Sequence, residues 1–165
     1  MDRVKVVDED EIVPSDDEFA DYLYEGQLFT GISREKDPRT GTIIAVAGYS
    51  DGKLHGAVRS WYANGQMARE EFRYNGAYHG PQREWYPSGQ PKKAGYVDRG
   101  VTVWEKTWSE QGELTSNHDV EALPDQLDRL TQARTKLSSF KVIDIDVNTW
   151  EFVERPDGWR IDERP

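Results

Sequence analysis

Histidine side chains can bind metal ions, and two of the three histidines in this sequence lie 24 residues apart. His55 and His79 are each followed by glycine, in LHGAVRSWY and YHGPQREWY. Zinc requires ligands about 2 Å from one point, whereas equivalent positions in successive hairpins are about 9 to 10 Å apart. The chain has no cysteine to complete such a site. We therefore expect no metal site, and we interpret both histidines as turn residues that bond to the backbone.

Carboxylates near the C-terminus could support acid–base chemistry. Asp144, Asp146, Glu151 and Glu154 alternate along strand-like stretches. This spacing leaves a paired acid–base site open, although solvated strand faces explain it more simply. The sequence contains no Gly-x-Ser-x-Gly turn, no phosphate-binding glycine loop and no histidine–glutamate zinc motif. We expect a protein that is not an enzyme and that uses no cofactor.

The surroundings of the two histidines are repeated. The stretch DGKLHGAVRSWYANGQ, which begins at Asp51, is matched 24 residues later by NGAYHGPQREWYPSGQ. Weaker copies lie on both sides, so that about four units extend over residues 22–114. A fixed period in this range indicates a repeat architecture.

Each unit has the composition of β-hairpins. Dipeptides such as Asn64-Gly65 and Asn75-Gly76 suit two-residue turns, because Gly, Asn and Asp tolerate positive φ. The stretches between them, such as AVRSWY and PQREWY, are long enough for strands and too short for stable helices. The sequence predicts a mainly β fold, a meander of antiparallel hairpins in a single-layer sheet. We expect turns near Gly41, Gly52, Gly65, Gly76, Gly89 and Gly112.

Alternation along the predicted strands places two tryptophans beside two arginines on one face, and two tyrosines on the other. These residues are Trp61, Trp85, Arg59, Arg83, Tyr62 and Tyr86. We favour tryptophans that form the core and pack against Gly56 and Gly80, where the missing β-carbon leaves room for a ring. The alternative is a binding face lined by tryptophan.

The segments YEGQLFTG, DGKLHGAVRSWYANGQMAREEFRYNGAYHG and REWYPSGQPKKAGYVDRG resemble MORN-type repeats, in the variant with a Trp-Tyr-x-Asn-Gly turn. The resemblance covers about residues 22–114 and implies a curved single-layer sheet of hairpins without catalytic residues. This variant is found in bacterial proteins often labelled antitoxins or immunity proteins. The third full unit departs from the pattern, since Val103 stands where His55 and His79 stand, and we interpret it as a terminal, capping unit.

Residues 115–165 are expected to cap the repeats with an amphipathic helix and a small β-hairpin. In LPDQLDRLTQARTKLSSF, four leucines fall on one helical face: Leu123, Leu127, Leu130 and Leu137. The following KVIDIDVNTWEFVERPDGWRIDE is typical of strands, with a hairpin turn at Asp157-Gly158. We expect the helix to lie on the small sheet and the pair to cover the last repeat strand. A separate functional domain is the alternative.

Residues 1–21 form an acidic N-terminal segment in which VKVV could be an edge strand. Asp16, Asp17 and Glu18 belong to a stretch that is either mobile, and ordered by a partner, or the start of a short helix that runs to Tyr24.

The net charge of −10 is concentrated at the two ends of the sequence. Residues 1–20 hold eight acids against two bases, residues 116–165 eleven against seven, and residues 49–115 eight against nine. Such a field repels nucleic acids and anionic membranes and attracts basic proteins. No apolar run is long enough to span a membrane, the start does not resemble a secretory signal, and the lack of cysteine suits a reducing compartment. We expect a cytoplasmic protein.

These observations favour a protein-binding module of the immunity or antitoxin kind, which neutralises a basic toxin domain by direct binding and is a monomer when free. The candidate contact residues are Asp16, Asp17, Glu18, Tyr62, Tyr86, Arg59 and Arg83. One alternative is a scaffold that assembles through its sheet. A second is a phospholipid-binding repeat protein, suggested by Arg59, Arg69, Arg73 and Arg83.

Overall fold

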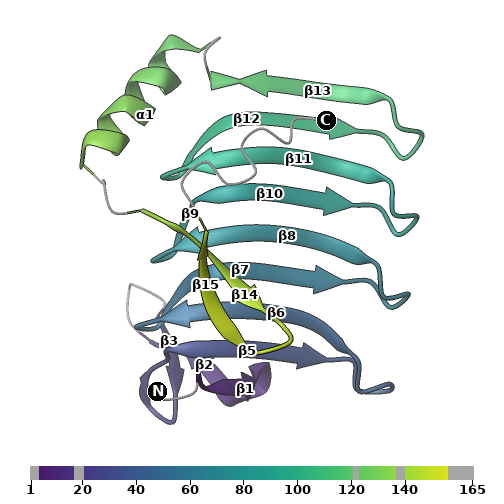
Figure 1. Ribbon diagram of the computed structural model, residues 1–165, viewed down its shortest axis with the longest axis vertical. Helices are drawn as coiled ribbons and strands as arrows, with labels where there is room; N and C mark the ends of the chain where they lie inside the picture. Colours follow the sequence, from purple (N-terminus) through teal and green to yellow (C-terminus); the bar gives the residue numbers. More distant parts are fainter. Residues whose placement is uncertain (1–3, 17–20, 121–122, 137–139, 156–165) are drawn as a thin grey trace.

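The protein is described by a computed structural model for residues 4–16, 21–120, 123–136 and 140–155. A ten-stranded, single-layer sheet dominates it (Figure 1). Its strands, in spatial order, are β1 (Val6–Asp8), β5 (Gly31–Lys36), β6 (Ile43–Ser50), β7 (Lys53–Trp61), β8 (Met67–Tyr74) with β9 (Ala77–Tyr78) beside it, β10 (Gly80–Trp85), β11 (Pro91–Asp98), β12 (Val101–Trp108) and β13 (Leu114–Asp119). All neighbours from β5 onward are antiparallel, so the predicted meander of hairpins is confirmed.

The remaining elements lie outside this sheet. They are η1 (Glu9–Glu11), a small sheet of β2 (Ile12–Pro14), β3 (Tyr22–Tyr24) and β4 (Gln27–Leu28), the helix α1 (Pro124–Lys136), and a hairpin of β14 (Val142–Asp146) and β15 (Glu151–Arg155). Within the described ranges, no helix has the length and the apolar character that crossing a bilayer requires.

Glycines close the hairpins where the sequence predicts turns. The six residues have φ between 70° and 86°, a left-handed conformation that glycine adopts without a steric penalty: Gly41, Gly52, Gly65, Gly76, Gly89 and Gly112. No helix interrupts the chain between Gly56 and Tyr96. The turn prediction is therefore confirmed along the whole sheet.

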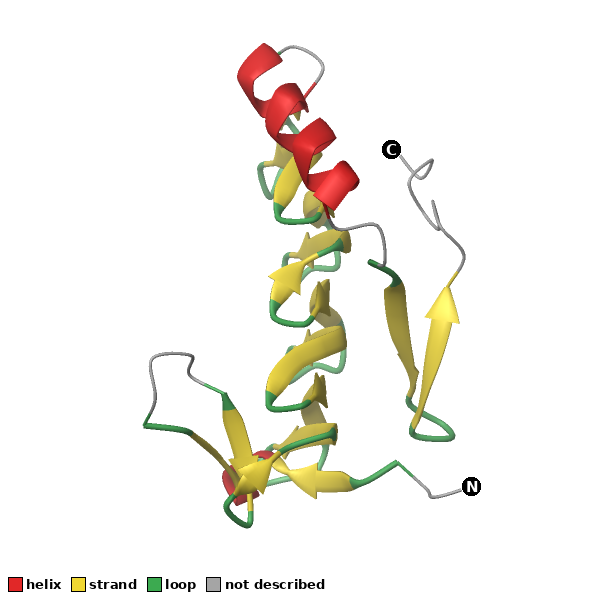
Figure 2. Cartoon of the chain, turned by 90° about the vertical axis from the view of Figure 1, so that its left-hand side faces the viewer, coloured by secondary structure: helices red, strands yellow, loops and turns green. Residues whose placement is uncertain are grey.

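The hairpin β14–β15 lies across one face of the sheet, over β7 and β8 (Figures 1 and 2). We call this the front face. Its buried cluster consists of Ile32, Ala57 and Phe72 from the sheet and Val142 and Ile145 from the hairpin. The core thus forms where apolar side chains of the sheet are buried under the β14–β15 hairpin, which comes after the whole sheet in the chain.

Glycine permits the close approach of the hairpin. A β-carbon built on Gly56 would lie 3.2 Å from the carbonyl oxygen of Ile143, and one on Gly80 would lie 3.3 Å from Cγ2 of Val142. These glycines accommodate the hairpin rather than a tryptophan ring. The tryptophan core predicted from the sequence is wrong, because Trp61 and Trp85 are only half-buried. They belong neither to this cluster nor to the second buried cluster, which consists of Val7, Ile12, Phe29 and Tyr49.

A chain of buried ion pairs fastens the hairpin to the sheet. The guanidinium of Arg59 donates to Asp144 Oδ1 at 2.5 Å, to the Ile145 carbonyl at 3.0 Å and to Glu70 Oε1 at 3.1 Å. Arg155 donates to the other oxygen of Asp144 at 2.7 Å. Burial alone would raise the pKa of Asp144, but the hydrogen bonds and charges of Arg155 and Arg59 outweigh it and hold the pKa below its ordinary value. The charged carboxylate is therefore the form that holds the hairpin.

The helix α1 was predicted to lie on the small hairpin, and this prediction is wrong. The helix packs against β12 at the far end of the sheet (Figure 1). Leu130 is buried, and Arg134 donates to Asp98 Oδ2 of β11 at 2.7 Å. Leu127, which was expected on the covered face, is 40% exposed. The ion pair and Leu130 thus anchor the helix beside the β11–β12 turn. The strand β13 stays largely exposed along its length.

The hairpin that the structure describes near the C-terminus turns between Val142–Asp146 and Glu151–Arg155. Asp146 makes the turn: its carbonyl accepts from the N–H of Trp150 at 2.7 Å and its carboxylate from the N–H of Asn148 at 2.8 Å. The turn expected at Asp157-Gly158 lies outside the described residues.

The N-terminal predictions are confirmed in one part and wrong in another. The edge strand expected in VKVV is confirmed as β1, which pairs in parallel with β5. The helix that would run to Tyr24 is wrong in its last part, because residues 22–24 form β3.

The ion-pair chain predicts the effect of Arg59→Met. This change leaves Asp144 and Glu70 buried with one fewer partner, so the free energy of unfolding should fall by about 3 to 5 kcal/mol in urea denaturation. Arg39→Met is the matched control, because the Arg39 side chain is 84% exposed and its loss should change stability by less than about 0.5 kcal/mol. A loss below about 1 kcal/mol for Arg59→Met would show that the hairpin docks without this network.

Candidate functional site

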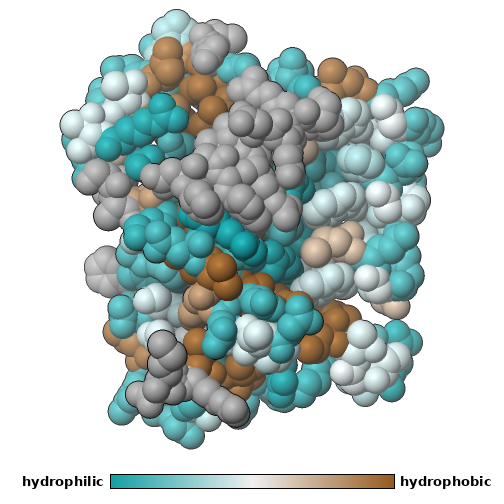
Figure 3. All heavy atoms as spheres, in the orientation of Figure 1, coloured by the Kyte–Doolittle hydropathy of each residue, from teal (hydrophilic) through white to brown (hydrophobic). Residues whose placement is uncertain are grey.

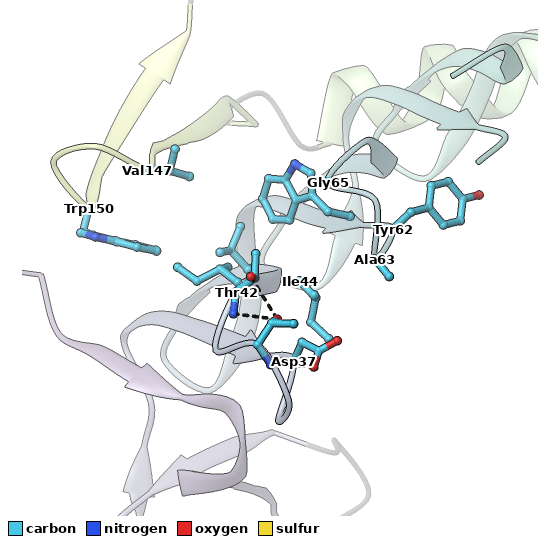
Figure 4. A pocket seen from close by; sticks show the side chains of 12 residues that line it. Asp37, Thr42, Ile44, Tyr62, Ala63, Gly65, Val147 and Trp150 are labelled. Carbon is cyan, nitrogen blue, oxygen red and sulfur yellow. Dashed lines mark hydrogen bonds between the residues drawn. The ribbon is translucent and has the colours of Figure 1, made fainter. Parts of the chain in front are cut away.

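An apolar cleft opens beside the turn of the C-terminal hairpin, and it is the candidate binding site. It has a volume of about 340 Å³. Its walls come from the β5–β6 loop, from β6, from the β7–β8 turn and from the hairpin turn, and include Ile44, Val46, Trp61, Val147 and Trp150 (Figure 4). In the space-filling view, hydrophobic atoms border the hairpin on this side (Figure 3). We call it the apolar cleft.

Local hydrogen bonds fix the two sheet loops that line the cleft. In the β5–β6 loop, Asp37 Oδ1 accepts from the N–H groups of Arg39 at 2.8 Å and Thr40 at 3.2 Å. In the β7–β8 turn, the N–H of Gln66 donates to the Asn64 side chain at 3.1 Å. Short Asp and Asn side chains stabilise turns in this way. Both walls are therefore formed before any ligand arrives.

The opposite wall is Trp150, whose backbone is unusual for its residue type. Its φ is 57°, in the left-handed region that bulky side chains rarely occupy. The ring packs against the edge of the buried cluster and also lines the cleft. Such conformations persist only where the surroundings enforce them, and they are concentrated at functional sites.

The cleft suits the burial of an apolar or aromatic group. Asp37 is the only carboxylate among the described lining residues, and its Oδ1 already accepts two N–H groups of its own loop. The other polar side-chain groups at the lining are hydroxyls, such as those of Thr40 and Thr42, and the indole N–H groups of the two tryptophans. A group of this kind would be held mainly by contact with tryptophan and aliphatic side chains.

The two tyrosines predicted to bind a partner connect successive repeats. The hydroxyl of Tyr62 donates to the carbonyl of Trp85 at 2.7 Å, and that of Tyr86 donates to the carbonyl of Trp108 at 2.9 Å. Tyr62 borders the apolar cleft, but its ring is turned away from Trp150 (Figure 4). Each tyrosine thus has a structural role at its turn.

The two predicted arginines lie in the buried network rather than at the cleft. The side chains of Arg59 and Arg83 are 11% and 15% exposed, and both bond to Glu70. The other arginines that suggested phospholipid binding, Arg69 and Arg73, both pair with Glu71. Each of the four guanidinium groups thus has a carboxylate partner within the chain, although Glu70 and Glu71 are each shared by two arginines.

Of the predicted acids, Asp16 is exposed, whereas Asp17 and Glu18 lie outside the described residues. Among the described residues, Asp16 forms no hydrogen bond or ion pair with the predicted tyrosines or arginines. The acids therefore stay candidates for long-range attraction rather than for a shared site.

The histidines have the turn role predicted for them. His55 Nδ1 lies 3.0 Å from Asn75 Oδ1 and 3.4 Å from the backbone nitrogen of Asn75, and His79 Nδ1 lies 3.3 Å from both the backbone nitrogen of Arg99 and Asp98 Oδ1. Burial lowers the pKa of His55, against a smaller opposing effect of its bond to Asn75. Among the residues described, no three His, Cys, Asp or Glu side chains are gathered as metal ligands.

The sequence analysis did not identify Ile44, Val147 or Trp150 as site residues. In the sequence, Trp150 belongs to the strand-like stretch TWEFVE. No neighbouring residue indicates that it lies opposite the β7–β8 turn, which comes much earlier in the chain. A weak signal existed in VNTW, where Asn is a turn former beside two apolar residues that a tight turn leaves accessible.

The repeats are similar to a known family. Residues 54–75 and 78–98 match the family model of the MORN repeat variant, as two adjacent copies. No curated protein matches the chain. The match covers β7 to β11, the part of the sheet that carries Trp61, Tyr62 and the buried arginines.

The tyrosine contacts predict that Tyr62→Phe destabilises the protein without affecting binding at the cleft. Loss of the hydroxyl leaves the Trp85 carbonyl without this donor, so unfolding should become about 1 kcal/mol easier in urea denaturation. Tyr78→Phe is the control, since its ring is held by a cation–π contact with Arg73, which does not require the hydroxyl. If Tyr62→Phe leaves stability unchanged but weakens partner binding, then the tyrosine is a contact residue after all.

Proposed function

We propose that this protein, whose central repeats resemble the MORN repeat variant, is a protein-binding module of the immunity or antitoxin kind that neutralises a basic toxin domain. The observation that carries the proposal is the apolar cleft, with Trp61 and Trp150 on its walls and fixed loops around it. A partner would insert an apolar or aromatic side chain there. Its inhibition would follow from direct binding.

The fixed walls support this role because binding energy is not spent on ordering loops. Buried aromatic anchors dominate the affinity of most protein interfaces, whereas surrounding polar contacts mainly exclude water. A cleft of about 340 Å³ lies at the small end of the range for ligand pockets. It suits one large side chain better than a whole metabolite.

Charge supports a cationic partner at long range. The chain carries a net charge of −10, and such a field attracts a basic protein toward the surface.

Site-specific photocrosslinking tests whether the cleft binds a partner. A benzophenone amino acid at Ala63, on the rim, should capture one basic protein in the native host. The same amino acid at Glu110, which holds the equivalent place in the last repeat's turn, should not. Capture at both positions, or at neither, would contradict the proposal.

Cleft variants then measure the contribution of the walls. Trp150→Ala should weaken binding of the purified partner by about 30-fold or more, as loss of a central anchor does. Because Trp150 also packs on the core, Val147→Ser serves as a second variant: Val147 is 41% exposed, and its loss should weaken binding several-fold without changing the melting midpoint. Leu114→Ala, at a residue that is 55% exposed on β13, is the control. Unchanged affinity in both cleft variants would refute the site.

Charge steering gives a separate kinetic prediction. The screening length falls from about 30 Å at 0.01 M salt to about 8 Å at 0.15 M. Replacing Asp16, Asp17 and Glu18 by their amides should therefore slow association several-fold at low salt and flatten its salt dependence, while dissociation changes little. Replacing Glu110, Glu113 and Asp125, three exposed acids elsewhere in the chain, by their amides provides a control for total charge. Association that speeds up with salt would rule out steering.

An assembly scaffold is the second candidate, and the exposed edge strand favours it. β13 pairs with β12 on one side, and its residues 114–117 are exposed. An edge of this kind can pair with a second copy. The mass in solution separates the two functions, since the inhibitor is a monomer without its partner and the scaffold self-associates.

A further inference from the structure

A second cleft, of about 640 Å³, lies at the opposite end of the strands, between α1 and the β11–β12 turn. Its polar lining consists of Arg99 and Thr102 from the turn region and of Gln126, Arg129, Gln132 and Lys136 from α1. In Figure 1, α1 and the β11–β12 turn lie at the left-hand end of the strands, whereas the β5–β6 loop and the β7–β8 turn, which line the apolar cleft, lie at the right-hand end. We call the second cleft the cationic cleft.

The spacing along α1 explains why these side chains converge. Residues 126, 129, 132 and 136 recur every three or four positions, so they share one face of the helix. Their polar groups are two amides, a guanidinium and an ammonium, and the turn adds a second guanidinium and a hydroxyl. Arg129 and Lys136 are exposed, and neither forms an ion pair with a described residue.

Carboxylates are absent from the described lining of the cleft, although the protein carries a net charge of −10. The nearby Asp98 is already bonded to His79, Arg99 and Arg134. Burial would raise its pKa, but the hydrogen bonds of His79 and Arg134 and the charge of Arg99 outweigh this and lower it to about 2. Asp128 accepts a hydrogen bond from Gln132. Positive charge therefore accumulates locally in an acidic protein.

Arg99 departs from the repeat pattern at this place. The first residue of the equivalent turns is Asp51 or Asn75, with φ of 48° and 47°, and Arg99 has a φ of 50°. Asp and Asn tolerate this left-handed conformation better than a long side chain does. The guanidinium is also positioned, by its bond to Asp98 and by the ring of Phe140 at 5.6 Å. Arg99 thus suits the turn less well than Asp or Asn does, but it places a positioned guanidinium at the cleft.

We propose that the cationic cleft binds a small molecule through a phosphate group. Arg129 and Lys136, which form no ion pair with a described residue, and Arg99, which Asp98 holds in place, together match an oxyanion that carries more than one charge. Guanidinium groups bind phosphate through paired hydrogen bonds. A single carboxylate would compensate less of this charge. The volume admits a group larger than phosphate itself. This site goes beyond the protein-binding function proposed above and does not depend on it.

The test is calorimetric titration of the full chain with inorganic pyrophosphate at low salt. The wild-type protein should bind one equivalent saturably. Arg129→Gln and Lys136→Gln should each weaken binding about tenfold, the loss expected for a charge-assisted contact, and because both side chains are exposed the variants should keep their melting midpoints. Arg39→Gln removes an exposed cation at the other end of the molecule and should change affinity by less than twofold.

Three results would overturn the proposal: no saturable binding to the wild-type protein at millimolar pyrophosphate, full affinity in both cleft variants, or an equal loss in the Arg39→Gln control. Pentaglutamate is titrated in parallel. If pentaglutamate saturates the site and pyrophosphate does not, the cleft recognises an acidic peptide and the phosphate assignment is wrong. Sulfate binding as tightly as pyrophosphate would likewise show a general anion site rather than one for phosphate.

Discussion

The structure depends on covering one face of a single-layer sheet. Hairpin repeats satisfy their backbone hydrogen bonds within the sheet, but one layer gives apolar side chains nothing to pack against. Here a distant hairpin supplies the second layer over β7 and β8. Its close approach requires glycine: a β-carbon on Gly48 would lie 2.7 Å from a ring carbon of Phe152, and one on Gly56 would crowd Ile143. Arg59, held by Glu70 and Asp144, then fixes the hairpin in register.

The apolar cleft is a consequence of that cover being partial. The hairpin is only five residues long on each strand, so its turn ends beside the β5–β6 and β7–β8 loops rather than sealing them. Trp150 is therefore buried on one side and accessible on the other, which is the arrangement that aromatic anchors of interfaces have. The same element stabilises the sheet and forms a wall of the candidate site.

Contacts near in sequence could be predicted and distant ones could not. The period of 24 residues and the Asn-Gly and Asp-Gly turns determine the meander, because turn chemistry acts over a few residues. Alternation correctly places Arg59 on the same face as Trp61, but it does not show that Asp144, 85 residues later, would pair with its charge. For the same reason glycines that admit a hairpin were interpreted as room for tryptophan rings. The site was missed because half of it, Val147 and Trp150, belongs to that distant hairpin.

Ion pairing within the repeats changes how the net charge should be interpreted. Most cations of residues 49–115 are paired within the chain. Arg83, Lys92 and Lys93 pair with carboxylates of the same segment, so they offset little of the acid at the two ends, whereas Arg59 also pairs with Asp144. The outward field is therefore mainly negative, except near Arg129 and Lys136 of the cationic cleft, which form no ion pair with a described residue. The two clefts lie at opposite ends of strands that are roughly 25 Å long at about 3.3 Å per residue, and they are also several strands apart at about 4.8 Å per strand. Their separation is therefore more than about three screening lengths at 0.15 M salt. An anion held at one cleft would therefore leave the association of a cationic protein at the other almost unchanged, and both sites can be occupied together.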